Sequence, residues 1–135
     1  MKDRTPSSRK ATPMRRVSVL TAAAAALAFA GTAYAHPKLV SASPAANATV
    51  AKPARLELRF SEKLVAAFSK ADLIMAAMPG MPEMKIASTA ALASDGKTLV
   101  VTPKAPLHPG RYNVAWHVVS TDTHKVAGNY AFAVK

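Results

Sequence analysis

A carboxylate and an imidazole stand one residue apart, at Asp122 and His124, within the polar segment Ser120–Gly128. In extended chain, residues i and i+2 project to the same side, so these two side chains would converge on one point. The segment follows an alternating run that ends near Val119, and a strand there would anchor it as a rim loop. The pair suits metal binding. It also suits an ordinary polar loop in which the Asp122 carboxylate accepts hydrogen bonds from nearby backbone N–H groups.

His36 follows the Ala-Tyr-Ala sequence at 33–35, the small-x-small pattern after which a signal peptidase cuts. Cleavage there would make His36 the new N-terminus, whose α-amine and ring Nδ1 can chelate one metal. Pro37 has no N–H for a metal to displace, so the chelate would end at those two nitrogens. A histidine can also follow a cleavage site by chance. Together with Asp122 and His124, however, His36 completes a tetragonal nitrogen and oxygen set, which is the arrangement expected for Cu(II).

Four methionines recur at every third position: Met75, Met78, Met81 and Met84. Thioethers are soft ligands that select Cu(I) over harder ions. Such a stripe can also be a helix face that packs into a core. Here Pro79, Gly80 and Pro82 exclude a continuous helix. We therefore expect a loop, on which flexible apolar side chains have little reason to pack, and the pattern favours a Cu(I) site.

The first 35 residues have the features of a secretory signal peptide. A basic stretch at 1–16 precedes an uncharged apolar run at 17–30, and the cleavage pattern follows. A membrane anchor would need about 20 apolar residues, more than this run contains. We therefore expect a cleaved signal at 1–35 and an exported, periplasmic domain at 36–135 that is not embedded in the membrane.

The mature domain carries twelve basic and six acidic residues, scattered without a basic run. This pattern lacks the clustered charge of a nucleic-acid-binding surface, so we expect no nucleic-acid partner. The sequence contains no cysteine. Any soft metal ligand must therefore be a methionine thioether.

Short runs of alternating apolar and polar residues, separated by proline and glycine, make up the mature domain. They predict strands at 56–60, 99–101, 112–119 and 130–134, with further strands at 39–40 and 73–75. Residues 65–70 allow one helical turn. Several short strands at this spacing predict an all-β fold, an antiparallel sandwich or barrel.

Two further histidines and the single tryptophan have structural explanations. His108 lies between Leu107 and Pro109, so we expect it in an exposed turn. His117 and Trp116 alternate on opposite faces of one predicted strand. Trp116 is therefore expected in the core, and neither histidine is expected to bind metal.

Four segments occur in order: HPKLV at 36–40, LELRFSEKLV at 56–65, MAAMPGMPEM at 75–84 and VVSTDTHKVAG at 118–128. With these segments the chain resembles the CopC/PcoC family of periplasmic copper-resistance proteins over essentially its whole mature length. The resemblance implies a small Greek-key β-barrel or sandwich of about seven strands, cupredoxin-like or immunoglobulin-like in topology. It also implies two separate copper sites at opposite ends of the domain.

The resemblance assigns ligands as well. The Cu(II) ligands would be the amine and ring of His36, with Asp122 and His124. The Cu(I) ligands would be the four methionines, Met75, Met78, Met81 and Met84. Two-site members of the family usually carry a histidine inside the methionine loop, whereas this loop has none, so a Cu(I) site here would be built from thioethers alone.

The family's role implies a periplasmic copper carrier or buffer in copper resistance and homeostasis, alongside an inner-membrane copper-uptake partner. We expect the protein to be a monomer. We also expect that it is not an enzyme, because the ligands come without an obvious acid–base constellation. One alternative is a copper redox enzyme of the histidine-brace type, resembling a monooxygenase. In that case Asp122 would occupy an equatorial position on the copper and hinder its reaction with oxygen. A metal-free interaction module is a third possibility.

Overall fold

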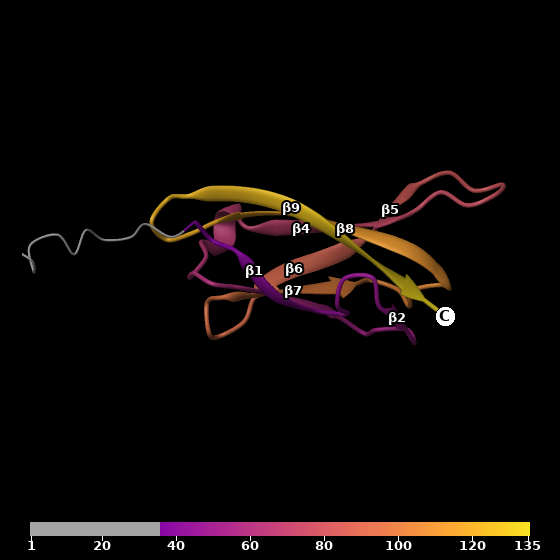
Figure 1. The fold of residues 1–135 in the computed structure, drawn as a ribbon, viewed down its shortest axis with the longest axis horizontal. Helices are drawn as coiled ribbons and strands as arrows, with labels where there is room; N and C mark the ends of the chain where they lie inside the picture. The colour runs from indigo at the N-terminus through magenta and orange to yellow at the C-terminus, as the bar shows by residue number, and fades with distance from the viewer. Residues whose placement is uncertain (1–35) are drawn as a thin grey trace, which may run out of the picture. The chain divides into compact units, whose positions relative to one another are not determined.

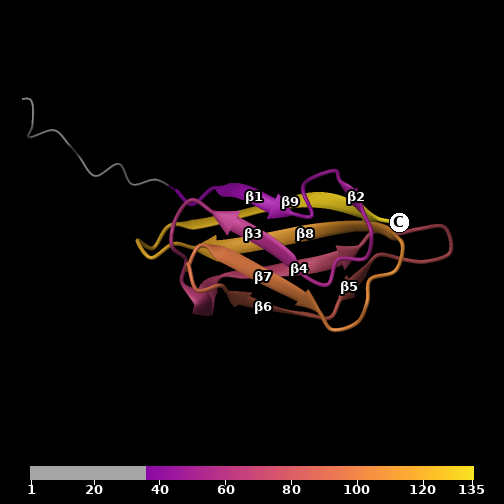
Figure 2. The same cartoon turned by 90° about the horizontal axis from the view of Figure 1, so that it is seen from below.

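A computed structural model describes residues 36–135, and the predicted signal peptide lies outside the described residues. The described chain forms two β-sheets packed face to face (Figures 1 and 2). One sheet has the order β1-β3-β7-β6 and the other β2-β9-β8-β4-β5. The strands are β1 (Leu39–Ser43), β2 (Thr49–Val50), β3 (Leu56–Phe60), β4 (Lys70–Met75), β5 (Met84–Ile86), β6 (Ser88–Leu92), β7 (Thr98–Pro103), β8 (Gly110–Val119) and β9 (Lys125–Val134). The all-β sandwich expected from the sequence is confirmed.

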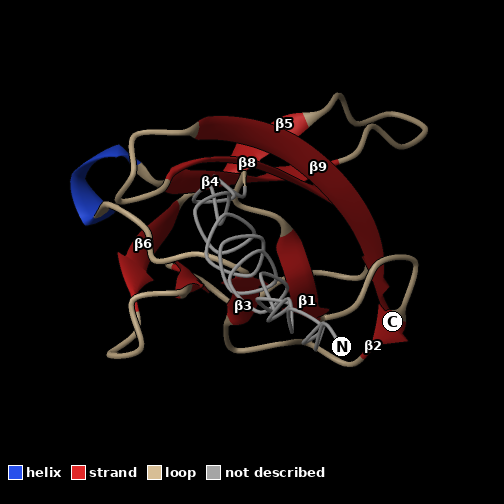
Figure 3. Ribbon diagram, turned by 60° about the vertical axis from the view of Figure 1, so that its left-hand side comes forward, coloured by secondary structure: helices blue, strands red, loops and turns tan. Residues whose placement is uncertain are grey.

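The predicted strands are all present, and three were missed. The missed strands are β2, β5 and β6, of which the first two span only two and three residues. β6 reads STAAL and lacks the large β-branched and aromatic residues that mark a strand in sequence. β2 runs parallel to β9, whereas every other strand pair is antiparallel within the described chain. The predicted helical turn is a 3-10 helix, η1 (Ala66–Phe68), drawn in blue in Figure 3.

The core lies between the sheets and follows the period-two alternation of the strands. On β8, burial alternates from Tyr112 to Val118, and on β3 the residues Leu56, Leu58 and Phe60 face inward. Full burial of an aliphatic or aromatic side chain stabilises the fold by about 1.5–3 kcal/mol. The alternation read from the sequence therefore points the correct faces into the core.

Trp116 is buried, as predicted, with its indole against Gly128 on β9. A Cβ added at Gly128 would lie 2.4 Å from Trp116 Cζ2, so only glycine leaves room for the ring. The indole also makes an edge contact with Phe60, at a centroid distance of 5.1 Å. This packing ties the two sheets together near one end of the domain.

β8 connects the two regions that carry candidate ligands. It begins at Gly110, beside the methionine segment, and ends at Val119, beside Ser120 and the segment with Asp122. Ten residues of antiparallel strand span about 30 Å. Figure 1 shows the β8–β9 connection at one end of the sandwich and the hairpin before β5 at the other.

Candidate metal centre

The connection between β8 and β9 is a tight loop closed by backbone hydrogen bonds. The Ser120 N–H donates to the His124 carbonyl at 3.0 Å, and the Thr123 N–H donates to the Ser120 carbonyl at 2.9 Å. Thr123 has a positive φ of 73°, which turns the chain back toward β9. These bonds place Asp122 and His124 at the rim of the five-stranded sheet, where the sequence predicted them.

Both oxygens of the Asp122 carboxylate have partners. The buried hydroxyl of Ser120 donates to Oδ1, and Oδ2 lies 3.0 Å from His124 Nδ1. The Ser120 hydroxyl, and after it the His124 ring, lower the pKa of the Asp122 carboxyl below its ordinary value. The carboxylate is therefore held anionic and in a defined orientation beside the imidazole.

His36 lies next to this loop although it comes from the other end of the described chain. Its ring centroid is 4.7 Å from that of His124, with an angle of 47° between the rings. Pro37 is fully buried. The Lys38 N–H donates to Ser61 Oγ at 3.0 Å, and the Ser61 N–H donates to the Lys38 carbonyl at 2.9 Å. These contacts fix the chain immediately after His36.

The three predicted Cu(II) residues thus lie in a row, from the Asp122 carboxylate to the His124 ring to the His36 ring. Across residues 36–135, no three His, Cys, Asp or Glu side chains form a group that could hold a metal ion. Side chains alone therefore do not complete a centre here. The fourth predicted donor, the α-nitrogen of His36, is not a side-chain atom. The complete predicted donor set, three nitrogens with one carboxylate oxygen, fits Cu(II).

Ser120 supports the candidate ligand Asp122, and sequence reasoning did not single it out. Its side chain is 1% exposed and donates to the carboxylate of Asp122, two residues later. Ser and Asp side chains commonly bond locally in turns, so the Ser120-x-Asp122 spacing was an available signal. It was not decisive, because the same spacing occurs in turns that bind nothing.

The methionine segment is a β-hairpin, so the expectation of a loop was wrong for two of its four methionines. Met75 ends β4 and pairs with Met84, which begins β5. Met78 and Met81 pair with each other through backbone bonds of 2.9 and 2.8 Å, around a turn containing Gly80. The prolines exclude a helix, as predicted, but they leave these two cross-strand pairs intact. Directly paired residues share a face of the sheet, so the two methionine side chains of each pair start from the same face.

The four methionines differ in exposure. Met75 is 5% exposed and belongs to the core, whereas Met81 and Met84 are 45% and 43% exposed. Met78 packs against the edge of the core. A Cβ added at Gly110 would lie 3.0 Å from Met75 Cε and 3.6 Å from Met78 Sδ, so these two side chains meet over the start of β8.

A model of the CopC domain matches residues 39–135. The chain belongs to the CopC family. It is 49% identical to copper resistance protein C of Xanthomonas campestris pv. juglandis, over 90% of this chain and 97% of that protein. It is 44% identical to a copper resistance protein C of Escherichia coli, over 81% of this chain and 89% of that protein.

Two solved structures share the fold of this CopC-family protein. The crystal structure of PcoC, a methionine rich copper resistance protein from Escherichia coli, gives a TM-score of 0.70 at 44% identity, over 75% of this chain and 100% of that one. CopC from Methylosinus trichosporium OB3b gives a TM-score of 0.65 at 30% identity, over 74% and 94% of the two chains.

The other histidines of this CopC-family chain lie where the sequence placed them. His108 is exposed in the turn before β8, where its carbonyl accepts a hydrogen bond from the Tyr112 hydroxyl at 2.7 Å. His117 is exposed on the outer face of β8, opposite to the face that carries Trp116. Within the described residues, no helix is both long and apolar enough to cross a membrane.

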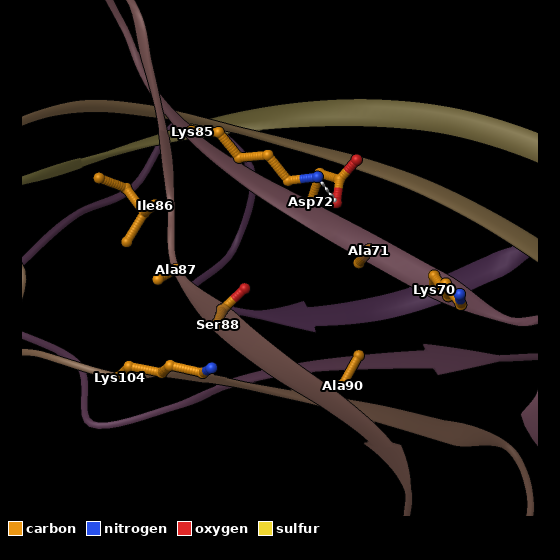
Figure 4. Close-up of a pocket in the computed structure, with 9 residues that line it drawn as sticks. All are labelled: Lys70, Ala71, Asp72, Lys85, Ile86, Ala87, Ser88, Ala90 and Lys104. Atoms are coloured by element: carbon orange, nitrogen blue, oxygen red, sulfur yellow. Dashed lines mark ion pairs between the residues drawn. The ribbon is translucent and has the colours of Figure 1, made fainter.

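A shallow hollow of about 450 Å³ lies where β4, β5 and β6 approach one another (Figure 4). Lys85 lies along one edge of it and pairs with Asp72 at 2.9 Å. Lys70 and Lys104 line the hollow at separate places, and none of the predicted copper ligands does. The hollow of this CopC-family protein is therefore distinct from both candidate ligand regions.

Proposed function

We propose that the protein is a periplasmic copper carrier or buffer in copper resistance and homeostasis. It binds Cu(II) through the amine and ring of His36, with Asp122 and His124. The observation that carries this proposal is the 4.7 Å approach of the His36 and His124 rings, with the Asp122 carboxylate 3.0 Å from His124. The relatives named as copper resistance proteins support the same role.

The arrangement suits binding of copper rather than its use in catalysis. Asp122 is held anionic by Ser120 and His124, so it adds negative charge and an oxygen donor beside two imidazoles. A carboxylate in an equatorial position would occupy the place that oxygen chemistry on copper requires. The protein is accordingly proposed to have no enzymatic activity.

Completion of this site depends on processing. While residue 35 is attached, the His36 α-nitrogen is an amide nitrogen, which is a poor donor compared with a free amine. Cleavage of residues 1–35 after export supplies the fourth donor. Copper is thereby bound tightly only after the chain has left the cytoplasm.

The methionine hairpin is proposed as a separate Cu(I) site. Met81 and Met84 are exposed, and Met78 lies at the edge of the core. These three thioethers are accessible to a soft ion. Met75 is buried, so it contributes to the site mainly by packing beneath Met78. An inner-membrane copper-uptake protein is the proposed recipient of the metal, and the carrier acts as a monomer.

The test is a Cu(II) titration of protein that begins at His36, followed by electron paramagnetic resonance. One tight tetragonal equivalent is expected. The matched control is protein that retains Ala35, confirmed by mass, because it keeps every side chain and loses only the free amine at His36. We expect the control to bind Cu(II) at least about 100-fold more weakly, since it loses a ligand rather than a supporting group.

Equal affinity of the two proteins would refute the terminal-amine site. Reductant-dependent release of products from chitin or cellulose would instead identify a redox enzyme. A mass spectrum of the protein isolated from cells checks that residue 36 is the natural N-terminus.

A further inference from the structure

A mostly apolar hollow of about 550 Å³ opens beside the candidate Cu(II) ligands. Its wall includes Ser120, two residues before Asp122, and Thr123, the residue directly after it. Val65, Ala67 and Phe68 supply apolar surface from the segment around η1, and Val119 supplies more from the end of β8. Phe68 is 64% exposed, the largest exposed fraction among the large apolar side chains of the described residues.

Hydrogen bonds tie the wall of the hollow to the loop that holds the ligands. The Val65 N–H donates to the Val119 carbonyl at 2.8 Å, and the Val119 N–H donates to Ser69 Oγ at 3.2 Å. The Thr121 N–H donates to the Lys63 carbonyl at 2.9 Å, directly before Asp122. The hollow is therefore a preformed surface whose position relative to the ligand loop is fixed by the backbone.

The rim of the hollow is basic. Lys70 and His117 are cross-strand partners on β4 and β8, and Lys125 begins β9. All three line the hollow, and none of its nine lining residues is acidic. The two lysines are exposed. Charge complementarity therefore favours an occupant that carries carboxylates around an apolar side chain.

The shape of the surface favours a protein over a lipid membrane. A membrane-binding face presents several apolar side chains that project into the bilayer, whereas Phe68 is the one large apolar side chain lining this hollow that is exposed, and the surface beside it is recessed, with volume for a side chain to enter. Protein interfaces commonly place an apolar anchor in such a recess and surround it with a polar rim.

We propose that this hollow is the docking surface for the protein that exchanges copper with this chain, and that the partner inserts an apolar side chain flanked by carboxylates. The proposal rests on the copper-carrier function proposed above and adds where the partner binds. Docking here places the partner next to Asp122 and His124 without covering the methionine hairpin at the other end of β8. Transfer then occurs between adjoining sites rather than through free ion.

The test separates docking from metal binding by two variants. One carries Lys70→Glu and Lys125→Glu, which reverses the rim charge, and the other carries Phe68→Ala, which removes an exposed side chain from the wall. The matched control carries Lys52→Glu and Lys104→Glu, the same charge change at two exposed lysines outside the hollow. Thermal unfolding of each purified protein checks that the fold is kept.

Each variant is measured for Cu(II) affinity in vitro and for copper tolerance in the natural host after deletion of the native gene. We expect affinity within about twofold of wild type for all of them. We expect the two hollow variants to lose most of the tolerance that the wild-type gene restores, and the control to keep it. Wild-type tolerance in the hollow variants would overturn the docking proposal, as would an equal loss in the control.

If the proposed carrier function itself is wrong, the same experiment gives a different result. If the wild-type gene restores no tolerance, or wild-type protein binds no Cu(II), the proposed function is wrong and the docking proposal falls with it. Sedimentation with vesicles of phosphatidylglycerol and phosphatidylethanolamine tests the membrane alternative. Binding of wild type but not of the rim variant would assign the hollow to the membrane and overturn docking by a protein.

Discussion

The two ends of β8 hold their candidate ligands in different ways. At the β8–β9 loop, hydrogen bonds orient the side chains themselves, because Ser120 and His124 each contact an oxygen of Asp122. At the β4–β5 hairpin, the hydrogen bonds between Met78 and Met81 join backbone atoms, and Met81 and Met84 extend with exposed side chains. The first end is ordered by directional polar contacts, and the second by strand register.

This difference follows from the chemistry of the donors. Imidazole and carboxylate groups have fixed hydrogen-bonding directions, so neighbouring residues can orient them before metal arrives. A thioether is a weak acceptor on a flexible chain and adapts its position to what it contacts. The nitrogen and oxygen end should therefore be sensitive to single changes in its supporting residues, whereas the methionine end should tolerate them.

The largest expected effect distinguishes the two ends of β8 by the oxidation state of the copper that each binds. His124→Ala should lower Cu(II) affinity more than about 100-fold, because loss of a ligand exceeds the about 10- to 100-fold loss typical of a supporting group. Its Cu(I) affinity should stay unchanged. The reciprocal variant, with Met81→Leu and Met84→Leu, should weaken only Cu(I) binding. Competition titrations with chromogenic chelators measure both, and a parallel loss of both affinities in either variant would show that the ends are not independent.

The second prediction distinguishes the buried methionine of the hairpin from its half-exposed partner by their effects on stability. Met75→Ala should lower the free energy of unfolding by about 2–5 kcal/mol, because it removes a buried side chain from the core. Met84→Ala, the same change at its half-exposed cross-strand partner, should shift it by no more than about 0.5 kcal/mol. Urea unfolding measures both. Equal effects would mean that Met75 is not a core residue.

A third, smaller effect concerns the support of Asp122. Ser120→Ala removes the hydroxyl that donates to the carboxylate and should weaken Cu(II) binding about 10- to 100-fold. Ser41→Ala, the same change at an exposed position on β1, serves as control and should leave affinity as in wild type. Unchanged affinity in Ser120→Ala would mean that the carboxylate does not need this orientation.

The smallest expected effect is on pH dependence in the absence of metal. The pKa of Asp122 is lowered by Ser120 and then His124, and that of Asp95 by the N–H of Lys97 and by Thr98. A lowered pKa means that each carboxylate stabilises the fold above its unfolded pKa, and that this stability is lost as pH falls through the folded value.

Asp122→Asn and Asp95→Asn should therefore each make stability less dependent on pH in the acid range. The measurement is the urea midpoint followed from neutral pH down to about pH 2, across the unfolded carboxyl pKa of about 3.9. An acid profile as steep as that of wild type would contradict the assigned hydrogen bonds.

Much of the fold followed from local pattern. Alternation at 56–60, 112–119 and 130–134 placed the correct side chains in the core, because one face of each strand is buried. The sequence did not predict β5, because its three residues form a strand through pairing with β4 rather than through their own β-strand propensity. The same pairing turned the expected methionine loop into a hairpin.

Sequence alone determined the donor types, the strands with strong alternation and the likeness to a copper-resistance family, because these depend on residue identity and local spacing. Tertiary structure decided which donors meet. His36 and His124 lie at opposite ends of the described chain and come together only because the start of β1 and the β8–β9 loop share one end of the sandwich. The separate exposures of Met75 and Met84 also required the sheet, since burial depends on what packs against a side chain from elsewhere in the chain.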